Sequence, residues 1–275
     1  MKTVISASRR TDIPAFYLDW FIEKINQGYI VVKNPFYPTQ KYRVSLKKSD
    51  VHSIVFWSKD FGEFLKKSSH FDHYNLYFIF TINDCKRWEP NVISLDKRLK
   101  QLEELVADYG PEFIEYRFDP IVYWRESGER ELLNNLNSFK AIIQHVSNLG
   151  INNCVFSFAN WYKKCISRSK KFGLVYYDPP LKEKLDIIKP MAQYCKTLGI
   201  RMYTCCNPEL TQISNIYPAH CINGNFLIRL FKEKCSIANT PTREACGCTK
   251  SKDIGNYNEQ ICKHACIYCY AHPLV

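Results

Sequence analysis

The stretch LYFIFTINDCKRWEPNVISLDKRLKQLEELVADYGPEFIEYRF, residues 76–118, decides the fold class. It begins with an apolar run rich in aromatic and β-branched residues (76–82), which is typical of a buried strand. Apolar residues then recur at helical spacing over 94–110, where Gly110 ends the pattern, and a second strand-like run follows at 113–118. A strand, a helix and a strand in this order predict a βαβ unit in a parallel sheet.

The same alternation continues along most of the chain. Seven runs look like strands: TVISAS (3–8), YIVVKN (29–34), SIVFWS (53–58), LYFIFTI (76–82), FIEYRF (113–118), CVFSFA (154–159) and RMYTCC (201–206), with AHCIN (219–223) as a candidate eighth. Further helical patterns cover 129–150, 181–199 and 225–235, and Pro190 predicts a kink or two short helices in the second. These patterns favour a (β/α)8 TIM-type barrel, closed or partly open, over residues 1–235.

A doubly wound open sheet is the alternative fold. The stretch ASRRTDIP after the first strand lacks the glycines of a dinucleotide-binding turn, so a Rossmann site is not favoured. From Ser236 the periodic patterns stop, and 236–275 is predicted to be an irregular cysteine-rich segment packed on the barrel.

Composition restricts the class of protein. The 275 residues are 46% hydrophobic and 24% charged, which is ordinary for a globular protein with one large domain or two small ones. We find no apolar run of about 20 residues, so no contact with a membrane is expected. The first residues do not resemble a secretory signal, which favours a cytoplasmic protein. The net charge of +11 suits a nucleic-acid partner, although the lysines are scattered without a block of like charge.

Polar side chains follow several predicted strands. The carboxyl ends of barrel strands carry the catalytic groups in such folds, so these positions are the candidate site. The residues expected to act on or bind a substrate are Arg9, Arg10, Asp12, Arg117, Asp119 and Glu209, and Asn160 and Asn207 are expected to bind a cofactor. Guanidinium groups favour an anionic substrate. In the alternative interpretation loops are simply polar, and Asp12 caps the helix that begins at Ile13–Pro14.

The thirteen cysteines are unevenly distributed. A chain kept reduced uses clustered thiols for metal binding or catalysis. Eight are dispersed and are predicted to be mostly core residues: Cys85, Cys154, Cys165, Cys195, Cys205, Cys206, Cys221 and Cys235. Cys205 and Cys206 also end a predicted strand, where they could face the site. The other five lie between Cys246 and Cys269.

The string CKHACIYCYA places Cys262, Cys266 and Cys269 on one tight loop, with Tyr268 before the last. Three thiolates can bind one face of a 4Fe–4S cluster and leave one iron open to a chelating cofactor or substrate. Tyr268 would cover one side of that cluster. Cys246 or Cys248 would close the cluster if either were the fourth ligand. Zinc held by four of these thiolates is the alternative metal, and His264 and His272 are further possible ligands.

The spacing C-x3-C-x2-C with an aromatic residue before the third cysteine resembles the motif of the radical S-adenosylmethionine (SAM) enzymes, especially the spore-photoproduct-lyase-like branch. The whole chain resembles the bacterial family DUF1848, on SASRRTDIPAFY, NPFYPTQ, VFWSK, CGCTKSKDIGNY and CKHACIYCYA. The resemblance implies an iron–sulfur protein and supplies no substrate. In radical SAM enzymes the three cysteines follow the first strand, whereas here they follow the last, which lies beside the first in a closed barrel.

The resulting hypothesis is a radical-SAM-like enzyme with a 4Fe–4S cluster at the barrel mouth. It would use SAM and an external one-electron donor to act on an unidentified small-molecule or nucleic-acid substrate. The alternative is a non-catalytic protein in which a closed iron–sulfur or zinc site stabilises a basic, nucleic-acid-binding barrel.

Overall fold

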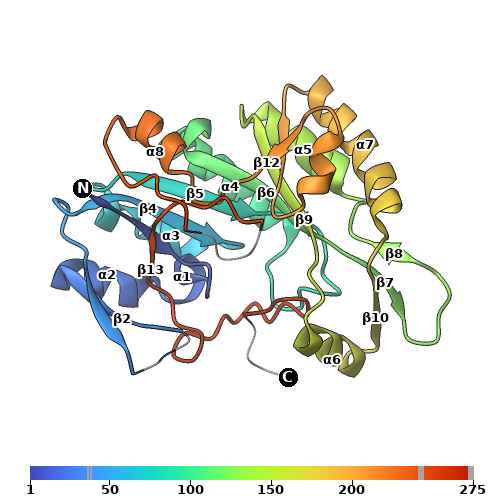
Figure 1. Ribbon diagram of the computed structural model, residues 1–275, viewed down its shortest axis with the longest axis horizontal. Helices are drawn as coiled ribbons and strands as arrows, with labels where there is room; N and C mark the ends of the chain where they lie inside the picture. The colour runs from blue at the N-terminus through green and yellow to red at the C-terminus, as the bar shows by residue number, and fades with distance from the viewer. Residues whose placement is uncertain (36, 38, 241–244, 272–275) are drawn as a thin grey trace.

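The protein is built on one eight-stranded sheet, seen in the computed structural model, which describes residues 1–35, 37, 39–240 and 245–271 (Figure 1). Every neighbouring pair in this sheet is parallel. Across the sheet the strands are β13 (Lys252–Asp253), β1 (Thr3–Ala7), β4 (Val51–Ser58), β5 (Leu76–Thr81), β6 (Ile114–Ile121), β9 (Asn153–Phe158), β11 (Arg201–Thr204) and β12 (Ile216–Pro218). From β1 to β12 the order follows the chain. A doubly wound sheet reverses its strand order, so that alternative is wrong.

The sheet is open in the described part of the chain. Strands β12 and β13 stand at its two edges and do not pair with each other there, so a closed TIM-type barrel is not confirmed. Two predicted strands account for the difference. YIVVKN forms β2 (Tyr29–Lys33), which pairs with β3 (Lys41–Ser45) in a separate antiparallel hairpin. AHCIN is not a strand, and β12 lies just before it.

The helices differ from the prediction in several places, and those over 18–27, 62–66 and 163–171 were not predicted. The remaining elements are α1 (Ile13–Phe16), α2 (Leu18–Gln27), α3 (Gly62–Lys66), α4 (Leu95–Tyr109), α5 (Phe139–Asn148), α6 (Lys163–Lys171), α7 (Leu181–Thr197), α8 (Gly224–Phe231), and the 3-10 turns η1 (Ser68–Phe71), η2 (Pro111–Phe113) and η3 (Pro208–Gln212). Helix α5 begins ten residues later than expected because β8 (Leu133–Asn134) pairs with β7 (Tyr123–Glu126), which also pairs with β10 (Leu174–Tyr177). Helix α7 continues through Pro190 without dividing. Within the described ranges, no helix combines the length and the apolar character needed to span a membrane.

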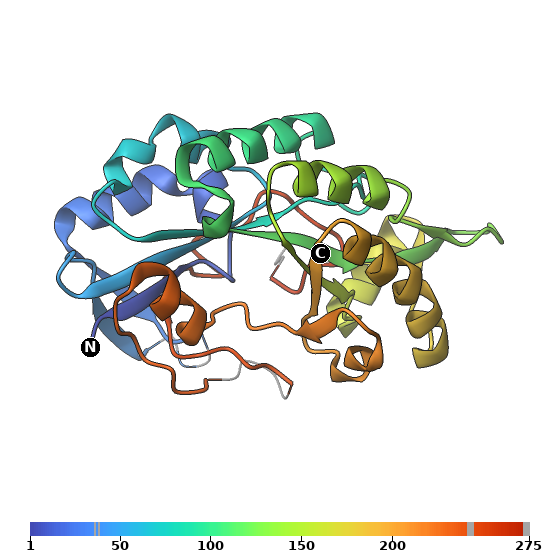
Figure 2. The ribbon, with the colours of Figure 1, turned by 90° about the horizontal axis from the view of Figure 1, so that it is seen from above.

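Alternate side chains of the strands pack on opposite faces of the sheet. On β4, Ile54 and Phe56 join the main core with residues of α1 to α5 and α7. Val55 and Trp57 face the other way and pack with Leu227 of α8. Figure 2 shows α2 to α5 on one side of the sheet, with α8 and the C-terminal segment on the other. The face that packs against α8 is called the inner face below.

Strand β13 attaches the C-terminal segment to β1. Its buried Asp253 accepts hydrogen bonds from the hydroxyls of Ser6 (2.9 Å) and Ser8 (2.7 Å) and from the backbone N–H of Arg9 (2.9 Å). A buried carboxylate is stable when its oxygens are hydrogen-bonded in this way. The cysteine loop that follows is thus held near the carboxyl end of β1.

Candidate metal centre

The loop that carries Cys262, Cys266 and Cys269 lies at the carboxyl ends of neighbouring strands. The Ile267 N–H donates to the Trp88 carbonyl (2.8 Å) in the segment after β5, and the Asn91 amide donates to the Lys263 carbonyl (3.0 Å). Open parallel sheets bind ligands at this end of their strands. The loop position is therefore one at which such proteins place their chemistry.

The three thiols of this loop, which we call the triad, are close enough to influence one another electrostatically. Burial, and then the nearby Glu89 carboxylate, raise the pKa of the Cys266 thiol well above its usual range, and Cys269 and Cys262 add to the effect. Burial, with Asp12 next, raises the pKa of Cys262 to about 12. The Cys269 N–H donates to the Cys266 carbonyl (3.0 Å), which makes the turn between them tight.

Asp12 holds the triad loop against the start of α1. One of its oxygens accepts from the Ala15 N–H (3.0 Å) and caps α1, as the alternative interpretation predicts. Its carboxylate also accepts from the Ser58 hydroxyl (2.8 Å) and the Lys59 N–H (2.9 Å). Nε2 of buried His264 lies 2.8 Å from it, which ties the loop to the start of α1.

Two charged groups beside the triad, the buried Glu89 and the half-buried Lys59, were not among the predicted site residues, although Lys59 was noted as a polar residue at a strand end. Glu89 accepts from Lys59 Nζ (2.8 Å) and from the Tyr268 hydroxyl. Burial lowers the pKa of Lys59, but Glu89 and then Cys266 raise it more, and the net direction is upward. Lys59 is thus a charged ammonium beside Cys266. The signals in the sequence were the single Lys that follows β4 and the Glu between Trp88 and Pro90.

Arg168 on α6 was also missed. It is buried, and its Nη1 donates to the carbonyls of Ile267 (2.8 Å) and Cys269 (3.0 Å). It therefore fixes the backbone between the last two cysteines of the triad. Its position on the buried side of a strongly basic helix was the only sequence signal.

The two arginines after β1 bind the C-terminal segment. Arg9 Nε lies 3.4 Å and Arg10 Nε 3.8 Å from the Asp253 carboxylate, and Arg10 Nη1 donates to the Gly255 carbonyl (3.0 Å). Tyr270, one residue beyond the triad, donates to the Arg9 carbonyl (3.2 Å). These arginines hold the segment that leads to the triad.

Arg117 and Asp119 of β6 lie on the inner face of the sheet. Arg117 is buried and pairs with Asp119 (2.7 Å) and Glu115 (3.2 Å), and its Nη1 lies 3.2 Å from Cys221 Sγ. Asp119 also accepts from the Ser157 hydroxyl. The guanidinium expected to bind an anionic substrate thus already has two carboxylate partners.

The remaining predicted residues are dispersed. Asn160 is exposed after β9, and the Asn207 amide donates to Glu209 (3.4 Å) on η3. The structure places Cys246 and Cys248 with Cys221 in one buried cluster, in which Cys248 makes side-chain hydrogen bonds with the other two. His272 lies outside the described residues. Among residues that are described, no group of three or more His, Cys, Asp or Glu side chains is already arranged to hold a metal ion.

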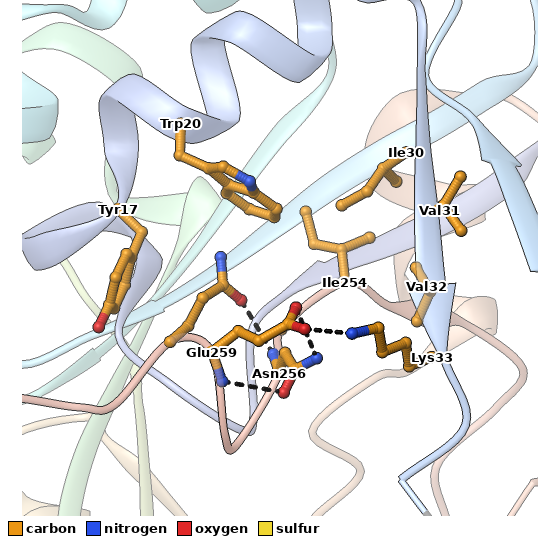
Figure 3. A pocket seen from close by; sticks show the side chains of 11 residues that line it. Tyr17, Trp20, Ile30, Val31, Val32, Lys33, Ile254, Asn256 and Glu259 are labelled. Carbon is orange, nitrogen blue, oxygen red and sulfur yellow. Dashed lines mark hydrogen bonds and ion pairs between the residues drawn. The ribbon is translucent and has the colours of Figure 1, made fainter. Parts of the chain in front are cut away.

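A pocket of about 170 Å³ lies beside the triad loop, between α2, β2 and residues 254–260 (Figure 3). Tyr17, Trp20 and Ile254 line it, and an ion pair between Lys33 and Glu259 crosses its rim. The Tyr17 hydroxyl donates to the carbonyl of the residue before Cys262 (2.6 Å). One wall of the pocket is therefore continuous with the triad loop.

Residues 4–271 match the family described as Domain of unknown function (DUF1848). The chain belongs to that family. No curated protein matches it. Among solved structures, a D-hydantoinase from a Bacillus sp. AR9 is similar at 11% identity and a TM-score of 0.33. The alignment covers 62% of this DUF1848 chain and 39% of the hydantoinase, and a likeness this weak carries no argument.

Glu115 gives the DUF1848 fold a testable pH dependence. Burial raises the pKa of Glu115 to about 7 from 4.5, although Arg117 opposes the shift. The folded state therefore holds this proton more tightly than the unfolded chain does. The proton on Glu115 stabilises the folded state fully below about pH 4.5, and this stabilisation is lost as the pH rises through 7.

Glu115→Gln should remove this dependence. Between pH 5 and pH 8 we expect the free energy of unfolding of the variant, relative to the wild type, to rise by about 1–3 kcal/mol. Urea unfolding at both pH values measures the change, with the exposed Glu112→Gln as the control. A difference between variant and wild type that stays constant with pH would contradict the assignment.

Proposed function

We propose that this DUF1848 protein is an iron–sulfur enzyme of the radical SAM kind, with a 4Fe–4S cluster held by Cys262, Cys266 and Cys269. The proposal is carried by the position of the thiols: the triad cysteines lie on one tight loop at the carboxyl ends of the strands, while Cys246 and Cys248 lie with Cys221 in a buried cluster. Three protein thiolates leave one iron for an external ligand. The separation of Cys246 and Cys248 from the triad argues against the closed-site alternative.

The donor set fits such a cluster. Thiolates are the usual ligands, and the triad loop supplies three of them from eight successive residues. When bound, the cluster would supply single electrons for the reductive cleavage of SAM at the open iron.

The chain's own groups would prepare this site in two ways. Arg168, Trp88 and Asn91 fix the loop backbone, which sets the directions of the thiols. Lys59 places a positive charge beside Cys266, which offsets the negative charge of bound thiolates.

The substrate is proposed to bind at the same carboxyl ends of the strands. An anionic substrate is the prediction from Arg9, Arg10 and Arg117, and it would have to compete with the carboxylates of Asp253, Asp119 and Glu115. An external one-electron donor is also part of the proposal, because reduction of the cluster consumes electrons that another molecule must supply.

Protein purified without oxygen tests the proposal. We expect iron and sulfide in equal amounts, and an electron paramagnetic resonance spectrum of the reduced protein that changes when SAM is added. Cys266→Ala should lose both the iron and the spectral change. Cys195→Ala removes a buried thiol from α7, far from the triad in the sequence, and should retain both. A spectrum indifferent to SAM, or zinc in place of iron at the triad, would instead favour the non-catalytic closed site.

A further inference from the structure

Five cysteines outside the triad lie together on the inner side of the sheet. They are Cys205, Cys206, Cys221, Cys246 and Cys248, which we call the inner thiols. The Sγ atoms of Cys205 and Cys206 are 3.9 Å apart and those of Cys205 and Cys221 are 3.8 Å apart. Cys248 continues this series through its hydrogen bonds to Cys221 and Cys246. Three of the five were expected to be ordinary core residues.

The inner thiols come from three separate segments. Cys205 and Cys206 directly follow β11, Cys221 follows β12, and Cys246 and Cys248 precede β13. Strands β11 and β12 stand at one edge of the open sheet, and β13 stands at the other. The backbone already meets across this gap, because the Thr249 N–H donates to the Ile222 carbonyl (2.9 Å). The inner thiols therefore lie in the gap between the two edges of the open sheet. We call this gap the seam.

The sulfur–sulfur distances suit one particular kind of metal site. Four sulfurs bound about 2.3 Å from a tetrahedral zinc ion lie about 3.8 Å from one another. The two printed distances, 3.8 and 3.9 Å, have this length. The five thiols form a chain of neighbours and not yet a closed shell, so binding requires the ends of the chain to approach each other. Cys206 lies in a bend with a left-handed backbone conformation (φ 56°), and Cys246 lies in an irregular segment.

The surroundings match the charge of bound thiolates. A zinc ion with four thiolates carries a net charge of about −2, which needs nearby cations when buried. Arg117 Nη1 is 3.2 Å from Cys221 Sγ, and Cys248 and Cys221 are among the groups that interact electrostatically with Arg9. Both arginines also have carboxylate partners, so they hold their positions whether or not a metal is present.

The CGC segment, residues 246–248, packs closely against His220. A Cβ at Gly247 would lie 2.0 Å from the ring of His220, so only glycine is accommodated between the two cysteines. Nδ1 of His220 is 2.7 Å from the Gly247 carbonyl, which fixes the segment against the residue before Cys221.

We propose that the inner thiols bind one zinc ion, with Cys205, Cys221 and Cys248 as ligands and Cys206 or Cys246 as the fourth. Each ligand releases its thiol proton to solvent on binding, and no redox change occurs. The ion would join the end of β12 to the segment before β13 and so close the seam that the strands leave open. This site is separate from the triad and does not depend on the function proposed for it.

Zinc content tests the proposal in a protein that lacks the triad. Cys262→Ala/Cys266→Ala/Cys269→Ala should bind about one zinc per chain, measured by mass spectrometry, and its cobalt form should show thiolate-to-metal charge-transfer absorption. Adding Cys205→Ala/Cys221→Ala/Cys248→Ala should abolish both signals, while adding Cys195→Ala should leave them unchanged. Single Cys206→Ala and Cys246→Ala variants then identify the fourth ligand, as the one whose loss weakens zinc binding.

Three results would overturn the proposal. These are zinc that persists in the variant without the three inner ligands, a triad-free protein that binds no zinc, and iron with sulfide in place of zinc. If the variants that also lack the inner ligands do not fold, chelation of the triad-free protein decides the question, because removing a bound zinc must lower its melting temperature. With the triad intact, Cys221→Ala should retain the triad iron, so failure at one site is distinguishable from failure at the other.

Discussion

Asp253→Ala should destabilise the protein by about 3–5 kcal/mol, because it removes the carboxylate that two partly buried arginines share. Asp253 is buried, and its oxygens accept from the Ser6 and Ser8 hydroxyls and from the N–H groups of Arg9 and Gly255. Arg9 and Arg10 would keep their charges without this partner. The free energy of unfolding in urea measures the loss.

The same variant should also lose the triad metal. Asp253 holds β13 against β1, and only eight residues separate it from Cys262. Asp253→Asn keeps an oxygen acceptor and should fall between the wild type and the alanine variant, whereas Asp108→Ala, at an exposed position of α4, should have little effect. If Asp253→Ala unfolds like the wild type, the C-terminal segment is held by other contacts.

The elements that the sequence predicts best are those whose signals are local. Helix α4 spans the stretch in which apolar residues recur at helical spacing, and it ends before Gly110 as expected. YIVVKN has the same apolar character as the strands of the main sheet, but it pairs in a hairpin outside it. Which strands pair depends on contacts between distant segments, and the period of a single segment does not contain that information.

Closure of the barrel could not be predicted for the same reason. It depends on the edges formed by β12 and β13, which have three and two residues. Strands this short have no recognisable alternation. The predicted eighth strand, AHCIN (219–223), directly follows β12 in the chain but does not form a strand itself.

In the candidate site, too, only groupings of residues that are close in the sequence could be predicted. The spacing of Cys262, Cys266 and Cys269 predicted that they would act together, because all three lie on one short loop. Nothing local links Cys205 to Cys221 or to Cys248, which are 16 and 43 positions away. Arg9 and Arg10 were expected to bind a substrate, and their observed partner, Asp253, depends on the pairing of β13 with β1.

Lys59→Met should destabilise the protein by about 3 kcal/mol, since it leaves the fully buried Glu89 carboxylate without its nearest cation. Glu89 is 1% exposed and lies 2.8 Å from Lys59 Nζ. The next cation, Arg98, has its Nη1 4.0 Å away and compensates only in part. Methionine has a similar length and flexibility, so the loss of charge and not of volume dominates the change.

A double-mutant cycle separates this ion pair from general damage to the site. Glu89→Gln alone should also be destabilising, because it leaves Lys59 buried next to a neutral amide. Lys59→Met/Glu89→Gln should recover part of the loss, so that the two changes together cost less than their sum by about 1–3 kcal/mol. Costs that simply add would mean that the two groups act independently.

If the triad binds the proposed cluster, Lys59→Met should in addition lower the reduction potential of that cluster, because the ammonium beside Cys266 favours the more negative, reduced form. Cyclic voltammetry of the folded variant measures that shift, and a potential equal to that of the wild type would place the cluster away from Lys59.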